Sequence, residues 1–182
     1  MRKISPFILA LLIIFSLVSF AHSDDKEKEI NSYLSEKTMR NTELNFFTGM
    51  FDFSDDKQRA AVLGLEHQND ELFIKSTRGA IYSPITGGFV TANNAFYLYT
   101  GIQAEYKIGS LIINPSFAPG YYGEGNGKDL GYPLEFKTEL QLAFDLSDST
   151  HLGMSYNHIS NASLGDKNPG ANSYMFNFLK QF

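Results

Sequence analysis

The stretch that decides the fold is residues 134–146, LEFKTELQLAFDL, in which apolar and polar side chains alternate. The even positions are apolar, interrupted only by a threonine: Phe136, Leu140, Leu142, Phe144 and Leu146. The odd positions carry the polar side chains: Glu135, Lys137, Glu139, Gln141 and Asp145. Because successive side chains of a β-strand point to opposite faces, the stretch predicts a strand with one apolar and one charged face.

Residues 96–108 repeat this alternation, which a soluble sandwich would also show. The averages of the chain fit a soluble domain, with 182 residues, 43% hydrophobic and 19% charged. However, 16 Phe and 10 Tyr are more than an ordinary core needs. Membrane β-barrels hide their hydrophobicity from such averages by alternating it along strands. Beyond residue 41 no stretch of 18 residues is apolar, which excludes helical membrane spans.

The number and spacing of the alternating segments favour the barrel. Eight candidate strands lie near residues 43–53, 59–68, 71–83, 94–108, 110–120, 133–147, 150–160 and 172–182. Short turns are expected at 69–70, 109–110 and 148–149, and long loops at 84–93, 121–132 and 161–171, with a short loop at 54–58. Short turns on one side and long loops on the other characterise outer-membrane barrels. We therefore predict an all-β fold, an eight-stranded antiparallel transmembrane β-barrel of the bacterial outer membrane, spanning residues 42–182 and filled by side chains.

The two ends of the chain agree with export to that membrane. Residues 1–23 have a basic start, an apolar stretch of about 14 residues and a small-x-small end, which predicts a secretory signal peptide. Residues 24–41 are charged and form a lead-in segment of unassigned role. At the other end Tyr174, Phe176, Phe178 and Phe182 share one parity, and a terminal Phe after alternating aromatics resembles the assembly signal of outer-membrane proteins.

Charge and cysteine content exclude several kinds of function. The formal charge is −5 and no basic stripe occurs, so we expect no nucleic-acid partner. The absence of Cys excludes disulfides, thiol nucleophiles and thiolate metal sites. His67 and His151 lack metal-ligand spacing, and we expect neither a metal nor a cofactor.

Two polar residues interrupt the apolar parity of the strand at 150–160, where Leu152, Met154 and Tyr156 are followed by His158 and Ser160. Both side chains are therefore expected to face lipid. On one strand face their Cα atoms lie about 6.6 Å apart, so the imidazole can reach the hydroxyl. His-x-Ser is thus a possible base and nucleophile pair, although a His or Ser at the barrel rim can also simply contact lipid headgroups.

The run 158–170, HISNASLGDKNPG, resembles the signature of the lipid A 3-O-deacylase (PagL-type) family. The resemblance extends upstream through NPSFAPGYY at 114–122, Gly125, DLG at 129–131 and LEF at 134–136. It implies an outer-membrane serine esterase that removes the ester-linked acyl chain at position 3 of lipid A. By the same resemblance Ser160 is the nucleophile, His158 its general base and Asn168 an oxyanion-binding side chain. The backbone amides around Ala162 and Ser163 supply further donors, and Asn161 is a supporting residue of the site.

One position departs from the family pattern. Four residues after Asn168 the family often has a Glu that orients the histidine, and here the residue is Asn172. An amide oxygen can accept a hydrogen bond from the imidazole but cannot offer it a negative charge. We expect Asn172 to complete the site with reduced activity, or Asp166 to serve as the acid, unless Asp166 is only a solvated loop charge.

The implied partner is lipid A, or lipopolysaccharide, with the site at the level of the outer leaflet. The rival hypothesis is a catalytically weak or inactive barrel that binds lipopolysaccharide or has a structural role. A third possibility is a barrel hydrolase for another acyl ester. The acyl-chain preference and a possible homodimer stay open at this stage.

Overall fold

The computed structural model describes residues 42–69, 75–77 and 80–182, so the predicted signal peptide and charged lead-in lie outside the described residues. The strands are β1 (Thr42–Phe51), β2 (Ala60–Asn69), β3 (Lys75–Thr77), β4 (Ala80–Thr91), β5 (Phe96–Ile108), β6 (Leu111–Gly123), β7 (Leu134–Ser147), β8 (Thr150–Ser160) and β9 (Ala171–Gln181). Within these described ranges no helix is long and apolar enough to cross a bilayer.

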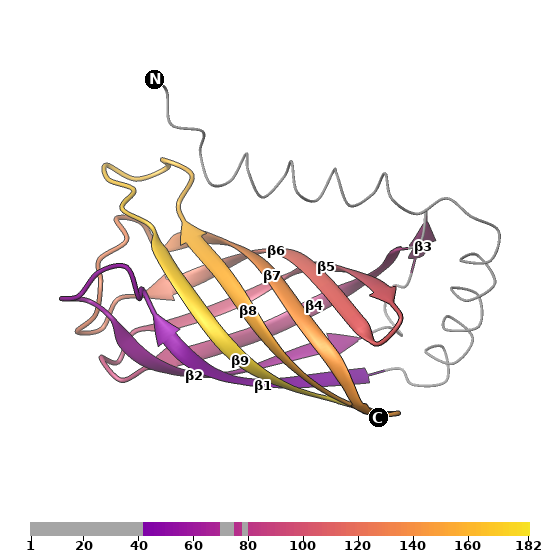
Figure 1. The fold of residues 1–182 in the computed structure, drawn as a ribbon. Coiled ribbons are helices and arrows are strands. Elements are labelled where there is room, and N and C mark those ends of the chain that lie inside the picture. The colour runs from indigo at the N-terminus through magenta and orange to yellow at the C-terminus, as the bar shows by residue number, and fades with distance from the viewer. Residues whose placement is uncertain (1–41, 70–74, 78–79) are drawn as a thin grey trace, which may run out of the picture.

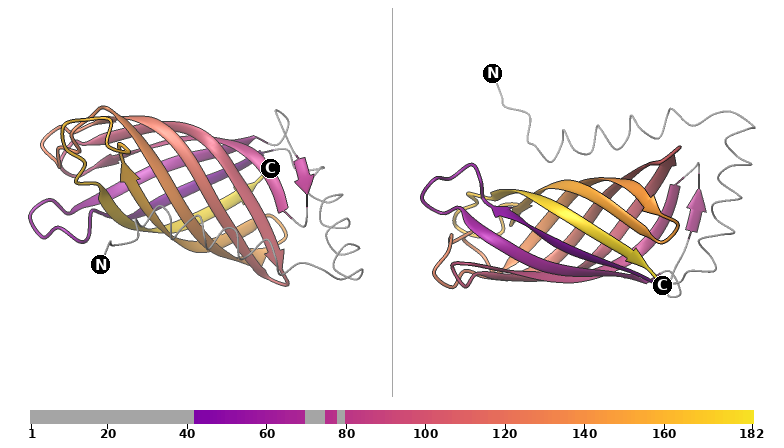
Figure 2. Two further views of the ribbon diagram at one scale, coloured as in Figure 1. Left: turned by 90° about the horizontal axis from the view of Figure 1, so that it is seen from above. Right: turned by 60° about the horizontal axis from the view of Figure 1, so that its bottom comes forward.

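Eight long strands form one closed antiparallel barrel (Figures 1 and 2). Each strand pairs with its neighbours in the chain, β9 pairs with β1, and the wall is continuous between β2 and β4 because these two strands also pair. The three-residue β3 pairs only with the beginning of β4. The predicted all-β, eight-stranded architecture is confirmed, and its connections lie at two opposite ends of the barrel.

The predictions around the third strand were wrong: the strand at 71–83, the turn before it and the long loop after it. Residues 84–93 were expected to form a long loop, but β4 continues to Thr91 and only residues 92–95 connect it to β5. Gly87 and Gly88 suggested a loop, whereas in the strand they make room for the next one. A Cβ on Gly87 would lie 2.7 Å from the Tyr99 hydroxyl, and one on Gly88 would lie 2.7 Å from Leu98 Cδ2. The turn expected at 69–70 is instead the connection 70–79, of which residues 70–74 and 78–79 are not described.

The remaining connections have the predicted arrangement, with short turns at one end of the barrel and longer loops at the other. Two-residue turns join β5 to β6 and β7 to β8, at one end of the barrel. At the other end, residues 124–133 join β6 to β7 and residues 161–170 join β8 to β9. We call this the loop end, and it also carries the β1–β2 loop, residues 52–59 (Figure 1).

The barrel interior is apolar near the loop end and polar in its middle, and a smaller apolar cluster, Ile112, Ala143 and Leu179, lies toward the turns. The apolar cluster near the loop end includes Phe51, Phe89, Tyr97, Tyr122, Leu130, Ile159, Ala171 and Met175. Below it Lys137 pairs with Glu66 at 3.1 Å and with Glu139 at 2.6 Å, and Tyr99 donates a hydrogen bond to Glu66. Further toward the turns, amide side chains pair across the interior, as Gln103 does with Gln68 at 2.8 Å. The side chains of the loop end are thus held on a packed apolar layer.

Candidate active site

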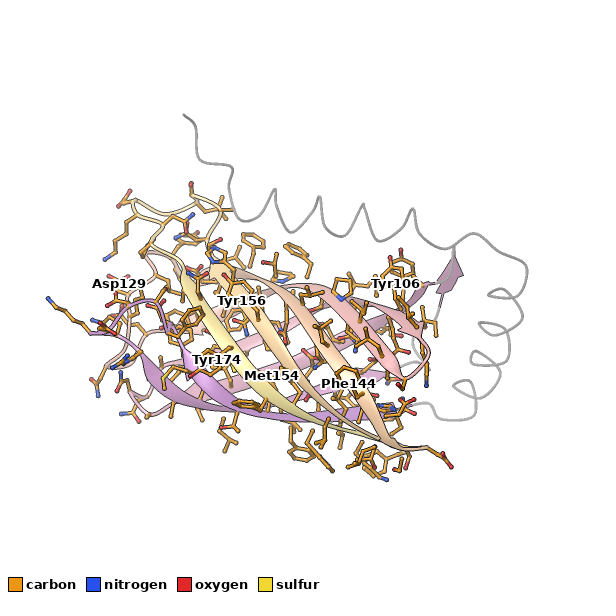
Figure 3. The ribbon with its side chains drawn as sticks, viewed as in Figure 1. Tyr106, Asp129, Phe144, Met154, Tyr156 and Tyr174 are labelled. Carbon is orange, nitrogen blue, oxygen red and sulfur yellow. The ribbon has the colours of Figure 1, made fainter. Side chains whose placement is uncertain are left out.

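Beyond the polar Thr150–Lys180 pair next to the turn, the outer face of the β8–β9 hairpin presents four cross-strand pairs. From the turn end toward the loop end they are Leu152 with Phe178, Met154 with Phe176, Tyr156 with Tyr174, and His158 with Asn172. The first three pairs are exposed side chains that are apolar or aromatic. Figure 3 shows Met154, Tyr156 and Tyr174 on this wall. The fourth pair is polar and only half-buried, so the parity predicted for His158 and Asn172 is confirmed.

His158 and Asn172 are joined by a hydrogen bond. His158 Nδ1 lies 2.8 Å from Asn172 Oδ1, and the same oxygen accepts a hydrogen bond from the Tyr156 hydroxyl at 2.7 Å. With an amide oxygen opposite it, Nδ1 must carry the hydrogen. In the neutral imidazole Nε2 is then the free acceptor, which is the state that a general base requires.

Ser160 follows on the same outward face, two residues beyond His158, and its side chain is half-buried. Within the described part of the chain its hydroxyl makes no hydrogen bond to the imidazole. In ligand-free sites such contacts are often long and tighten only with substrate. The structure therefore brings His158 and Ser160 to one face of the wall, where neither Nε2 nor the hydroxyl has a hydrogen-bond partner among the described residues.

Gly170 packs directly against the imidazole. A Cβ on this residue would lie 2.8 Å from His158 Cε1, and its φ of +63° falls in the left-handed region. Both features require glycine at this position. The glycine of the Asn-Pro-Gly run thus leaves room for the base.

The loop between β8 and β9 is built around the buried Asn161. Its side-chain amide donates hydrogen bonds to the carbonyls of Leu130 and Lys167, both at 2.9 Å, and its Oδ1 accepts from Ser163 N at 2.9 Å. Its backbone N–H donates to Asn168 Oδ1 at 3.1 Å. Asn161 therefore fixes the loop to the neighbouring β6–β7 loop.

The loop that follows Ser160 offers two hydrogen-bond donors, the Ala162 N–H and Asn168 Nδ2. Ala162 and Ser163 both have positive φ angles, 53° and 66°. The Ser163 N–H is engaged by Asn161, whereas the Ala162 N–H has no acceptor among the described residues. Asn168 uses its Oδ1 as an acceptor, which leaves its Nδ2 as a donor on an exposed side chain.

The two long loops are also joined at the surface by an ion pair, in which Lys167 Nζ lies 2.5 Å from Asp129 Oδ2. The Lys167 ammonium and the Gly131 N–H hold the pKa of the Asp129 carboxyl below its usual range. Asp166, the alternative acid, is exposed and makes no hydrogen bond or ion pair within the described ranges. No group of three or more His, Asp or Glu side chains able to hold a metal occurs there either.

Comparison with known proteins places the chain in a family. Residues 62–180 match the family described as lipid A 3-O-deacylase (PagL). The chain belongs to the PagL family. It is 30% identical over 87 residues to "Lipid A deacylase PagL" of Bordetella bronchiseptica, an alignment that covers 48% of this chain and 42% of that relative. The chain thus matches less than half of that relative's length.

The barrel of this PagL-family chain is also similar to solved structures. A crystal structure of the outer membrane enzyme PagL superposes with a TM-score of 0.59 at 18% identity, covering 77% of this chain and 99% of that one. A de novo designed transmembrane β-barrel superposes with a TM-score of 0.51 at 11% identity, covering 78% and 95%. The fold is that of an outer-membrane β-barrel.

Sequence reasoning missed the residues that contact Asn172 from the β1–β2 loop. Asn172 Nδ2 donates to Ser54 Oγ at 3.3 Å, and the backbone N–H of Asn172 donates to Asp52 Oδ1 at 3.3 Å. Phe53 N donates to the Asn172 carbonyl, and its ring packs against Tyr174 with centroids 5.5 Å apart. The stretch Phe53-Ser54-Asp55-Asp56 looks like any turn, so only the pairing of β1 with β9 reveals its place beside the PagL-type signature.

Proposed function

We propose that this chain is an outer-membrane serine esterase that hydrolyses the ester-linked acyl chain at position 3 of lipid A. Family membership supports the reaction class. The observation that carries the residue assignment is the 2.8 Å hydrogen bond between His158 and Asn172 on the outward wall, two residues before Ser160. An outward wall of a membrane barrel is otherwise apolar, because polar groups facing lipid are costly.

In the proposed first step Ser160 Oγ attacks the carbonyl carbon of the ester while His158 Nε2 takes the hydroxyl proton. Asn172 Oδ1 holds the imidazole in the tautomer that leaves Nε2 free, by accepting from Nδ1. This is the role that the family often gives to a glutamate. The amide orients the ring but adds no negative charge to stabilise the imidazolium, so the step is expected to be slower than with a carboxylate.

The negative charge that develops on the carbonyl oxygen needs donors. The Ala162 N–H and the Asn168 side-chain amide, both free in this loop, are assigned that task. When the tetrahedral intermediate collapses, the bond to the sugar oxygen breaks and His158 returns its proton to that oxygen. A water molecule, deprotonated by His158, then attacks the acyl-enzyme, which releases the fatty acid and regenerates Ser160.

The substrate is a membrane lipid, which explains a site on the outer wall of the barrel. The loop end is assigned to the cell-surface side, so that His158 and Ser160 lie at the level of the outer leaflet. The acyl chain would then lie along the apolar part of the same wall, against Met154, Tyr156 and Phe176. A soluble substrate would have no need for catalytic groups that face lipid.

Mass spectrometry of lipid A tests the proposal. Purified protein in detergent micelles, or cells that express it, should convert lipid A to a species lacking one ester-linked acyl chain. Ser160→Ala should abolish the conversion, while Ser110→Ala, a matched change of an exposed serine at the opposite end of the barrel, should leave it intact. Unmodified lipid A with the wild type would reject the enzyme and favour a barrel that only binds lipopolysaccharide.

A further inference from the structure

A chain of hydrogen bonds continues from Asn172 into the loop end, away from His158. Asn172 Nδ2 donates to Ser54 Oγ at 3.3 Å, and Ser54 Oγ lies 3.3 Å from Asp52 Oδ1. The other oxygen of Asp52, Oδ2, is paired with Lys128 Nζ at 2.6 Å. The Asp52 side chain is completely buried. The chain thus links β9, the β1–β2 loop and the β6–β7 loop.

The direction of each hydrogen bond in this chain follows from which groups can donate. The Asp52 carboxylate can only accept, so the hydrogen between it and Ser54 comes from the Ser54 hydroxyl. A serine hydroxyl has one hydrogen, and toward Asn172 it can therefore only accept. Asn172 must then turn its Nδ2 to Ser54, which leaves Oδ1 for His158.

The orientation of this amide decides which nitrogen of His158 carries the hydrogen. With Oδ1 toward the ring, Nδ1 is the donor and Nε2 the free acceptor. A rotated amide would present Nδ2 to the ring and favour the tautomer with hydrogen on Nε2, which cannot take a proton from Ser160. Tyr156 does not decide between the two, because its hydroxyl can either donate or accept.

The β1–β2 loop is held in the position that this role needs. Asp52 N donates to Ser173 Oγ, Phe53 N donates to the Asn172 carbonyl, and Asn172 N donates to Asp52 Oδ1. Asp52 also adopts a φ of 47°, in the left-handed region. These contacts fasten the loop to the first residues of β9, so Ser54 and Asp52 keep their places relative to the amide.

We propose that Ser54 and Asp52 are positioning residues for the reaction, which select the productive tautomer of His158 by fixing the orientation of the Asn172 amide. The inference rests on the proposed function. It also explains how an asparagine can stand where the family often has a glutamate. The two oxygens of a carboxylate are equivalent acceptors, whereas an amide orients the histidine only if its nitrogen end is held elsewhere.

A comparison of two backgrounds tests the proposal through the rate of lipid A deacylation. With Asn172 present, Ser54→Ala should lower kcat about five- to tenfold and leave KM unchanged, because a hydrogen bond that orients the base is lost. In the Asn172→Asp background, Ser54→Ala should change kcat less than about twofold. Ser54→Thr retains the hydroxyl, so its kcat should be much closer to that of the wild type than to that of Ser54→Ala. An equal loss in both backgrounds would mean that Ser54 is merely structural and would overturn the proposal.

The tautomer itself can be observed by ¹⁵N NMR of histidine-labelled protein in micelles, with the His158 signals assigned from His158→Ala. The wild type should show hydrogen on Nδ1, and Ser54→Ala should shift His158 toward hydrogen on Nε2. This measurement needs no activity. An inactive wild type with the expected tautomer would reject the proposed function alone, whereas an unchanged tautomer in Ser54→Ala would reject the role of Ser54.

The Asp52 carboxylate, with which the series of hydrogen bonds from Asn172 ends, is tested by Asp52→Asn. Asp56→Asn is the matched control. Asp56 lies in the same loop, is exposed and pairs only with Arg59 among the described residues. Asp52→Asn should lower kcat and alter the His158 tautomer, and Asp56→Asn should do neither. Heat-dependent mobility in gel electrophoresis reports whether each barrel is folded. If Asp52→Asn does not fold, the Ser54 variants alone test the positioning role.

Discussion

The outward pairs of the β8–β9 hairpin differ sharply between the middle of the wall and its loop end. Met154 with Phe176 and His158 with Asn172 occupy the same two strands, the same face and the same register, only four residues apart. The first pair suits contact with lipid. The second is polar, and its side chains are hydrogen-bonded to each other at 2.8 Å. Since the backbone is the same, the difference lies in the side chains alone, and the polar pair at the loop end fits the proposed active site.

The largest effect is expected when the polar pair is made apolar. His158→Leu should lower lipid A deacylation by roughly 10⁴-fold or more, because loss of the base alone nearly abolishes catalysis in serine hydrolases. The barrel should be at least as stable as the wild type, since an apolar side chain replaces a polar one on a lipid-facing wall. Deacylation rates and urea unfolding in lipid vesicles measure the two quantities. A variant that retains activity would exclude His158 as the base.

A smaller effect is expected from crowding the imidazole without removing it. Gly170→Ala places a methyl group 2.8 Å from His158 Cε1 and strains a backbone with φ of +63°. The ring must then shift away from Asn172 or from Ser160, and we expect kcat to fall roughly 10- to 100-fold, as small misplacements of catalytic groups do. Gly109→Ala is the control, because Gly109 has a similar φ of +61° but open space around its Cβ position. Equal effects of the two changes would point to backbone strain and not to contact with His158.

Adding charge to the polar pair should raise the rate. Asn172→Glu supplies a carboxylate in place of the amide, and it would stabilise the imidazolium formed when Ser160 loses its proton in the proposed reaction. In a serine protease the opposite change, from carboxylate to amide, costs about 10⁴ in kcat, mainly through the wrong tautomer. Since Asn172 Oδ1 already lies 2.8 Å from His158 Nδ1, which favours the productive tautomer, we expect a gain of only about tenfold. An unchanged rate would mean that position 172 is not coupled to His158.

The sequence predicts the wall far better than the surroundings of the site. Alternation alone placed Met154, Tyr156, His158 and Ser160 on one face, because every second residue of a strand must point the same way. It failed at Gly87, since a glycine in a strand cannot be told from a glycine in a loop without the neighbouring Tyr99. Asp52 and Ser54 were also missed, because their contacts with Asn172 depend on which strands lie side by side.

Those two residues precede Asn172 by well over a hundred positions, at separations of 120 and 118. They reach it only because the barrel closes β1 against β9. Turn-forming residues such as Ser and Asp occur in most loops, so their type carries no signal of a role. The signature at 158–170 is local and could be recognised in the sequence. The contacts that orient it form only when the barrel closes, so the sequence could not predict them.

The smallest effect on catalysis is expected when the apolar pair is made polar. Phe176→Asn places an unpaired amide opposite Met154, with no partner of the kind that Asn172 finds in His158. An unsatisfied polar group in an apolar setting costs about 1–3 kcal/mol, so urea unfolding in lipid vesicles should show a loss of that size. Deacylation per folded molecule should change less than about threefold, since the acyl chain loses only part of its contact surface. Phe176→Leu is the control and should change stability little. Should Phe176→Asn unfold like the wild type, this part of the wall would not face lipid, and the contrast between the two pairs would lose its physical basis.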